Sequence, residues 1–65
     1  MSGSYREMVE AELAEIDAPP SSAAFVAEMT AVVAADKLDR GEGDVNTVNM
    51  MNDALSDLAF AAHQD

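Results

Sequence analysis

Residues 22–40 read SAAFVAEMTAVVAADKLDR, and this stretch decides the fold because it is the longest run of the chain that can form one uninterrupted helix. Wound at about 3.6 residues per turn, it carries apolar side chains on nearly all sides. Its large face comprises Phe25, Val26, Met29, Val32 and Val33, and its small face comprises Ala23, Ala27, Ala31, Ala34 and Ala35, with Leu38 beside them. A helix of this kind is normally buried on more than one side, so we expect it to be central.

The residues that flank this stretch predict one helix before it and one after it. Pro19 and Pro20 end a preceding helix, because proline lacks the amide hydrogen and restricts the residue before it. Gly41 suits the left-handed conformation at which many helices stop. The predicted helices span about 4–17, 22–40 and 46–62. Their expected N-caps are Ser4 (in a capping box with Glu7), then Ser21 or Ser22, and then Asp44 or Asn46.

The first and third predicted helices each carry one main apolar stripe. The first stripe is Tyr5, Val9, Leu13 and Ile16, and the second, with the spacing of an antiparallel bundle seam, is Val48, Met51, Leu55, Leu58 and Ala62. Met50 and Phe60 fall outside this seam, so either a second surface covers them or they are exposed. Asp36 and Arg40, four residues apart, predict an ion pair at the end of the central helix or a polar contact with a partner.

The expected fold is all-α, either a small three-helix bundle or a helical homodimer built around the central helix. The chain has 65 residues, which allows a single small helical domain over residues 1–65, and no segment alternates as a strand would. In the homodimer version the interface residues are Ala27, Ala31, Ala34 and Leu38, because small side chains let helices approach closely. The sequence leaves open whether the chain's own helices or another copy covers the alanine face.

Composition narrows the classes of function. Thirteen acidic residues and three basic ones give a net charge of −10, which argues against direct binding to nucleic acid or to an anionic membrane. There is no cysteine, so disulfides and thiolate zinc sites are excluded. No apolar run reaches membrane-spanning length, and the N-terminus lacks the pattern of a signal peptide, so the default expectation is a cytoplasmic protein.

The sequence contains no constellation that predicts catalysis, and we expect no enzyme activity, no cofactor and no bound metal. His63 is the only histidine, and the serines are better explained as helix caps or surface residues than as nucleophiles. Asp39, Glu42, Asp44 and Asn46 surround the second turn and superficially suggest a calcium loop. The alternating ligands and terminal glutamate of such a loop are missing, so helix termination and capping explain these residues better.

The acidic surface and the apolar surplus together predict a non-enzymatic protein-binding module. Acids near the C-terminus of a helix are locally unfavourable, so stability does not explain them there. The partner-binding residues of this hypothesis are Glu10, Glu15, Asp17, Met50, Asp53, Asp57 and Phe60. Its most concrete form is an inhibitor that imitates nucleic-acid charge and occupies the basic surface of a nucleic-acid-handling protein, as a phage or mobile-element protein would by analogy. The alternative is a structural or assembly subunit that forms a homo-oligomer through its apolar helix faces.

Overall fold

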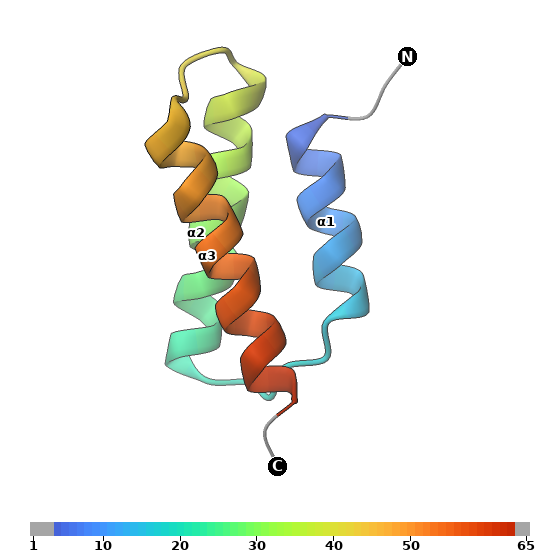
Figure 1. Ribbon diagram of the computed structural model, residues 1–65. Coiled ribbons are helices and arrows are strands. Elements are labelled where there is room, and N and C mark those ends of the chain that lie inside the picture. Colours follow the sequence, from blue (N-terminus) through green and yellow to red (C-terminus); the bar gives the residue numbers. More distant parts are fainter. Residues whose placement is uncertain (1–3, 64–65) are drawn as a thin grey trace.

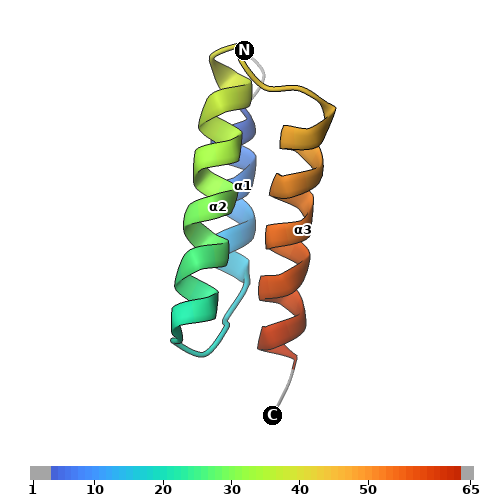
Figure 2. The ribbon, with the colours of Figure 1, turned by 90° about the vertical axis from the view of Figure 1, so that its left-hand side faces the viewer.

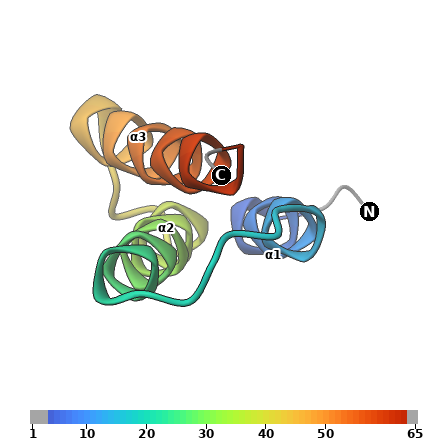
Figure 3. The same ribbon diagram turned by 90° about the horizontal axis from the view of Figure 1, so that it is seen from below.

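Residues 4–63 of the computed structural model form three α-helices and contain no strand. Helix α1 is Tyr5–Glu15, α2 is Ser22–Asp39 and α3 is Val45–Ala62. Successive helices run in opposite directions (Figures 1 and 2). Viewed from below, α2 and α3 form a pair and α1 lies on one side of that pair (Figure 3). The prediction of a small all-α three-helix bundle is confirmed, and within these residues no helix is both long and apolar enough to cross a membrane.

Side chains cap the start of each helix. The Ser4 hydroxyl accepts a hydrogen bond from the Glu7 amide at 3.1 Å, which is the serine half of the predicted capping box, without a return bond from Glu7. The Ser21 hydroxyl accepts one from the Ala24 amide at 3.0 Å. The reciprocal bonds of a full capping box occur at α3. There the Asp44 carboxylate accepts from the Thr47 amide at 3.1 Å, and the Thr47 hydroxyl accepts from the Asp44 amide at 3.3 Å.

The C-terminus of α2 closes as the glycine predicts. Gly41 has φ of 75°, and the amides of Gly41 and Glu42 donate to the carbonyls of Leu38 and Lys37 at 3.0 Å each. These two bonds are the Schellman motif, in which the left-handed residue lets the chain turn back over the helix end. The turn sends the chain back along α2, so α3 lies antiparallel to it.

Helix α1 ends two residues earlier than predicted. The last helical residue is Glu15, and Ile16 is already extended with ψ of 122°. A proline clashes with the carbonyl four residues before it, so Pro19 and Pro20 disfavour helix at positions 15 and 16. Asp17, predicted in the last turn, therefore lies in the connection to α2.

The core is built from small side chains of α2 and larger ones of its neighbours. Its buried members are Val9, Ala31, Ala34, Ala35, Met51 and Ala54. The chain's own helices therefore cover the alanine face at Ala31, Ala34 and Ala35, whereas Ala27 is half-buried and Ala23 is exposed. Helix α2 packs most extensively against α3 and next against α1, while α1 and α3 touch only slightly.

The expectation that α2 is buried on more than one side is wrong for most of its large face. Phe25, Val26, Met29 and Val33 are 43–63% exposed, and only Val32 of this face packs against the core. Both neighbouring helices lie on the alanine side, because small side chains allow the closest approach of helix backbones. Neither of them is then left to cover the opposite side of α2.

The predicted seam of α3 is also rotated. Met51 and Leu58 are buried as expected, but Ala54 and Thr47 are buried as well, whereas Leu55 is only half-buried. Ala54 and Thr47 point towards α2, the main neighbour of α3, and the predicted seam points between α2 and α1. The Tyr5 to Ile16 stripe of α1 is likewise only partly buried, with Val9 fully enclosed and Tyr5 44% exposed.

Candidate protein-binding surface

A cluster of large apolar side chains covers the outward face of α2 and continues onto α3. We call it the apolar ridge and define it as Phe25, Val26, Met29, Val33 and Met50. Their exposed fractions are 63%, 61%, 43%, 58% and 54%, in that order. Scattered exposed apolar residues are ordinary on protein surfaces, but a contiguous cluster of large ones is typical of a surface that contacts another molecule.

Helix geometry places the ridge opposite the core. At about 100° per residue, the four ridge residues of α2 span about 100° of its circumference, and the middle of that arc lies about 180° from the buried Ala31, Ala34 and Ala35. The inner face of α2 therefore carries small, buried side chains, and its outer face carries large, exposed ones. Met50 joins the ridge from the edge of α3 that adjoins α2.

The ridge borders a shallow groove between α2 and α3. One part of the groove, about 400 Å³, is lined by all five ridge residues together with Thr30, Ala34, Lys37 and Thr47. Its continuation is lined by Val26, Thr30 and Met50 again, and then by Ser22, Ala23, Asp53 and Asp57. Met50 thus stands in the middle, Lys37 lies near one end, and two carboxylates lie towards the other.

Of the residues predicted to bind a partner, the structure brings three together. Met50, Asp53 and Asp57 line the same stretch of groove. Phe60, 67% exposed, shares that side of α3, since helical rotation places these four residues within about 80° of one another. Phe60 does not line the groove itself.

The acids predicted at the other end of the sequence do not join this surface. Glu10 and Glu15 lie on α1, and Asp17 follows it. Helix α1 faces a different side of α3, where Leu55 and Ala59 line a groove with Met8 and Ile16 of the α1 segment. Leu55 and Met50 are five residues apart, which is about 140° around the helix. The seven predicted residues therefore form more than one patch.

The residues predicted as an oligomer interface lie inside the bundle. Ala31 and Ala34 are 0% and 2% exposed, and Ala27 and Leu38 are half-buried against the core. The surface of α2 that is open to a second copy is the apolar ridge, on the opposite face. The sequence pattern predicted Met50 as a partner-binding residue but favoured burial of the four ridge residues of α2, since apolar periodicity does not show which of two faces is covered.

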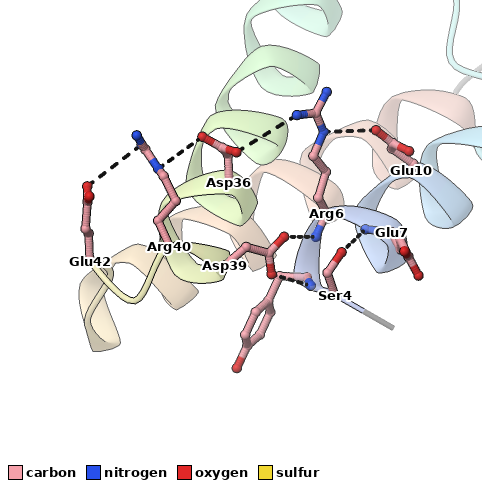
Figure 4. Close-up of polar contacts among 9 residues, drawn as sticks. Ser4, Arg6, Glu7, Glu10, Asp36, Asp39, Arg40 and Glu42 are labelled. Atoms are coloured by element: carbon pink, nitrogen blue, oxygen red, sulfur yellow. Dashed lines mark hydrogen bonds and ion pairs between the residues drawn. The ribbon is translucent and has the colours of Figure 1, made fainter. Parts of the chain in front are cut away.

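A polar network joins the N-terminus of α1 to the C-terminus of α2 (Figure 4). The Asp39 carboxylate accepts hydrogen bonds from the backbone amides of Tyr5 at 2.8 Å and Arg6 at 3.0 Å. It therefore caps a helix that begins 34 residues earlier in the chain. Sequence reasoning missed this cap because no local pattern connects the two segments.

Ion pairs extend the same network. Arg6 contacts Glu10 at 3.1 Å and Asp36 at 3.9 Å, and Arg40 contacts Asp36 at 3.3 Å and Glu42 at 3.8 Å. The predicted Asp36–Arg40 pair is confirmed. These side chains are about half exposed, so each pair contributes little stability by itself, about 0–1 kcal/mol.

The second turn uses its acids for capping. Asp39 caps α1, and Asp44 caps α3. The pKa of Asp44 lies below its ordinary value of 3.8, first because its carboxylate accepts the Thr47 amide hydrogen bond, then because it accepts the Thr47 hydroxyl, and further through the charge of Lys37. Across residues 4–63 no three histidine, aspartate or glutamate side chains are grouped as metal ligands.

All three cations of the chain lie near one end of the molecule. Arg6 and Arg40 take part in the network described above, and Lys37 lies in the last turn of α2. Ion pairs within the described part of the chain involve both arginines, whereas Lys37 lines the groove beside the ridge. The opposite end of the groove therefore carries acidic charge from Asp53 and Asp57 that no nearby cation offsets.

Comparison with known proteins adds no relative to these observations. The chain matches no family model, no curated protein and no solved structure.

Proposed function

We propose that this protein is a non-enzymatic binding module that uses the apolar ridge to occupy a surface of another protein. The observation that supports this proposal is the division of α2 into two faces. Ala31, Ala34 and Ala35 pack inside, and its largest side chains stay 43–63% exposed. A chain selected for stability alone would gain by burying those side chains, because full burial of one of them contributes about 1.5–3 kcal/mol.

The chemistry of the ridge suits contact with a partner. Aromatic and methionine side chains are enriched in protein interfaces, and methionine adapts its shape to the opposing surface. The ridge supplies Phe25, Met29 and Met50, with two valines between them. Covering five half-exposed side chains would yield several kcal/mol from the hydrophobic effect, which is enough to anchor a complex.

The charge of the chain favours a partner with a basic surface around an apolar centre. The net charge is −10, and the cations are confined to one end. Asp53 and Asp57 extend the groove beyond Met50, so they would face the rim of a partner seated on the ridge. Complementary charge at the rim accelerates association and excludes acidic partners.

The proposal is tested by capture from the native host with a matched pair of variants. Val33→Glu places a charge on the ridge, and Ala11→Glu places the same charge on the exposed side of α1. We expect the wild-type chain and Ala11→Glu to retain the same partner, and Val33→Glu to lose it. Retention of the same proteins by all three chains would exclude the ridge as the binding surface.

A narrower form of the proposal is an inhibitor that imitates nucleic-acid charge on a nucleic-acid-handling protein. The large acidic excess supports it, and it would draw on Glu10, Glu15 and Asp17 as well as on the groove. Partner binding would then weaken steeply between about 50 and 500 mM salt, and duplex DNA would compete with it. Changing those three acids to lysine would abolish binding, whereas salt-insensitive binding would leave only the apolar form of the proposal.

The alternative function is that of an assembly subunit that forms a homo-oligomer. The exposed ridge supports this alternative too, because a second copy also offers an apolar surface. The assembly subunit differs from the binding module in its partner, which is another copy of this chain, and in the pattern of charge that the interface requires.

A further inference from the structure

We infer that, when no other partner is bound, the apolar ridge pairs with the ridge of a second copy of this chain, with the two α2 helices antiparallel across a two-fold axis. This inference rests on the ridge as the binding surface of the proposed function but not on the identity of any heterologous partner. It goes beyond the proposed function because it specifies what covers the ridge in the isolated protein.

The two ends of the groove carry opposite charges. Lys37 lines one end, Met50 lies in the middle, and Asp53 and Asp57 line the other end beside Ser22 and Ala23. Along α2, Lys37 and Ala23 are separated by about 21 Å at 1.5 Å per residue. The surface thus has a positive group at one end and two negative groups at the other, with apolar side chains between them.

A two-fold axis through the middle of such a surface lays each end against the opposite end of the second copy. Lys37 of each copy then faces Asp53 and Asp57 of the other, so two equivalent sets of opposite charges form. Met29, Val26 and Met50 lie near the axis and meet their own counterparts, which buries the ridge on both sides.

A parallel arrangement of the two α2 helices would bring like charges together. With α2 helices parallel, Lys37 would meet Lys37, and the carboxylates of one copy would meet those of the other. Like charges in contact oppose association, whereas the antiparallel arrangement brings the lysine of each copy to the two carboxylates of the other. Charge complementarity therefore selects the two-fold antiparallel dimer among the ways in which two ridges can meet.

The expected dimer is of modest size and affinity. The described chain exposes 4599 Å², so a standard interface of about 800 Å² per partner would cover about a sixth of it. Two chains of net charge −10 repel each other overall, which weakens the dimer at low salt. Because the same ridge would bind a heterologous partner, dimer formation and partner binding compete.

The test is sedimentation equilibrium of the full chain from micromolar to millimolar concentration at fixed salt, with far-UV circular dichroism to verify folding. We expect a concentration-dependent dimer. Val33→Glu should be monomeric and folded, because position 33 is 58% exposed within one chain. A wild-type chain that stays monomeric throughout, or a Val33→Glu variant that dimerises normally, would overturn the inference.

The charge pairing has its own matched control. Lys37→Gln and Ala11→Glu both change the net charge from −10 to −11, but only the first removes a charge from the groove. Lys37→Gln should weaken the dimer about tenfold, since two exposed sets of opposite charges are lost, and Ala11→Glu should leave its affinity nearly unchanged. Equal effects of the two variants would contradict the antiparallel pairing.

A charge swap completes the test. Lys37→Asp alone should weaken the dimer further, and adding Asp53→Lys in the same chain should restore part of the affinity, because the net charge returns to −10 and position 37 of each copy again faces an opposite charge at position 53 of the other. A double variant as weak as Lys37→Asp would contradict the pairing. A monomeric wild-type chain whose partner capture is lost in Val33→Glu would exclude the dimer while the proposed function stands. A wild-type chain that dimerises, together with partner capture that Val33→Glu leaves unchanged, would exclude the proposed function while the dimer stands.

Discussion

The two faces of α2 are both apolar, yet one is the centre of the core and the other is exposed. The inner face holds Ala31, Ala34 and Ala35, each no more than 2% exposed, and the outer face holds residues with far larger apolar area. The size of an apolar side chain therefore does not determine whether it is buried. Small side chains let α1 and α3 approach one side of α2 closely, and the large ones are left for a surface that another molecule can cover.

The largest expected effect comes from placing one charge on each face in turn. Ala31→Glu should unfold the protein, because a buried carboxylate without a partner costs about 3–5 kcal/mol and a domain of this size has little stability to lose. Val33→Glu should change the free energy of unfolding by no more than about 0.5 kcal/mol. Urea denaturation followed by circular dichroism measures both. At protein concentrations that dissociate a dimer, similar losses in the two variants would mean that the chain's own helices cover the outer face.

Truncation of a large side chain should have the next largest effect, and the loss of stability should differ between the two faces. Met51, 2% exposed, fills the core against the alanines, so Met51→Ala should destabilise the protein by about 2–5 kcal/mol. Phe25→Ala removes a larger side chain that is 63% exposed, and we expect a loss below about 1 kcal/mol. Thermal melts at low protein concentration, where a dimer would be dissociated, provide the comparison. A greater loss for Phe25→Ala would break the assignment of inner and outer faces.

Loss of the Asp39 cap, which ties the start of α1 to the end of α2, should have a smaller effect on stability. Asp39→Ala removes the carboxylate that accepts the amides of Tyr5 and Arg6, and loss of such a cap costs about 0.5–2 kcal/mol. Hydrogen exchange at those two amides should accelerate more than exchange in α3. Asp17→Ala, outside the helices and away from this cap, is the control. Unchanged exchange at both amides would show that Asp39 does not hold α1 in place.

The smallest effect concerns Asp44 and depends on pH. Its pKa is lowered in the folded chain, so the carboxylate contributes stability above its ordinary value of 3.8, and this contribution is lost as the pH falls through the lowered pKa. Asp44→Ala should therefore be less stable than wild type at neutral pH, and the two stability curves should converge below about pH 4. Denaturation at a series of pH values measures the difference, and a constant gap at all pH values would contradict the capping role of the charged form.

Local features of this fold were predictable because they depend on neighbours in the sequence. Ser4 caps α1, Gly41 ends α2, and Pro19 and Pro20 separate the first two helices, all within a few residues of the groups they satisfy. The end of α1 was misplaced by two residues because the prolines act on carbonyls one turn earlier.

The candidate site was harder to predict because it depends on which helix faces cover each other. Met50, Asp53 and Asp57 do share a groove, as their spacing on one helix allows. Glu10 and Glu15 do not join them, since α1 packs against another side of the α2–α3 pair. The cap that Asp39 provides to Tyr5 and Arg6 was not foreseen, because it joins residues more than 30 positions apart in the chain.

The sequence by itself determined that this chain is all-α, where its helices begin and end to within about two residues, and that α2 has two apolar faces. Those properties follow from backbone hydrogen bonding and from periodicity, which act over one or two turns. Only the tertiary structure decided that the alanines point inward and the ridge outward, and that the cations gather at one end. Each of these depends on how closely whole helices can approach, which is a property of three surfaces at once and not of any one segment.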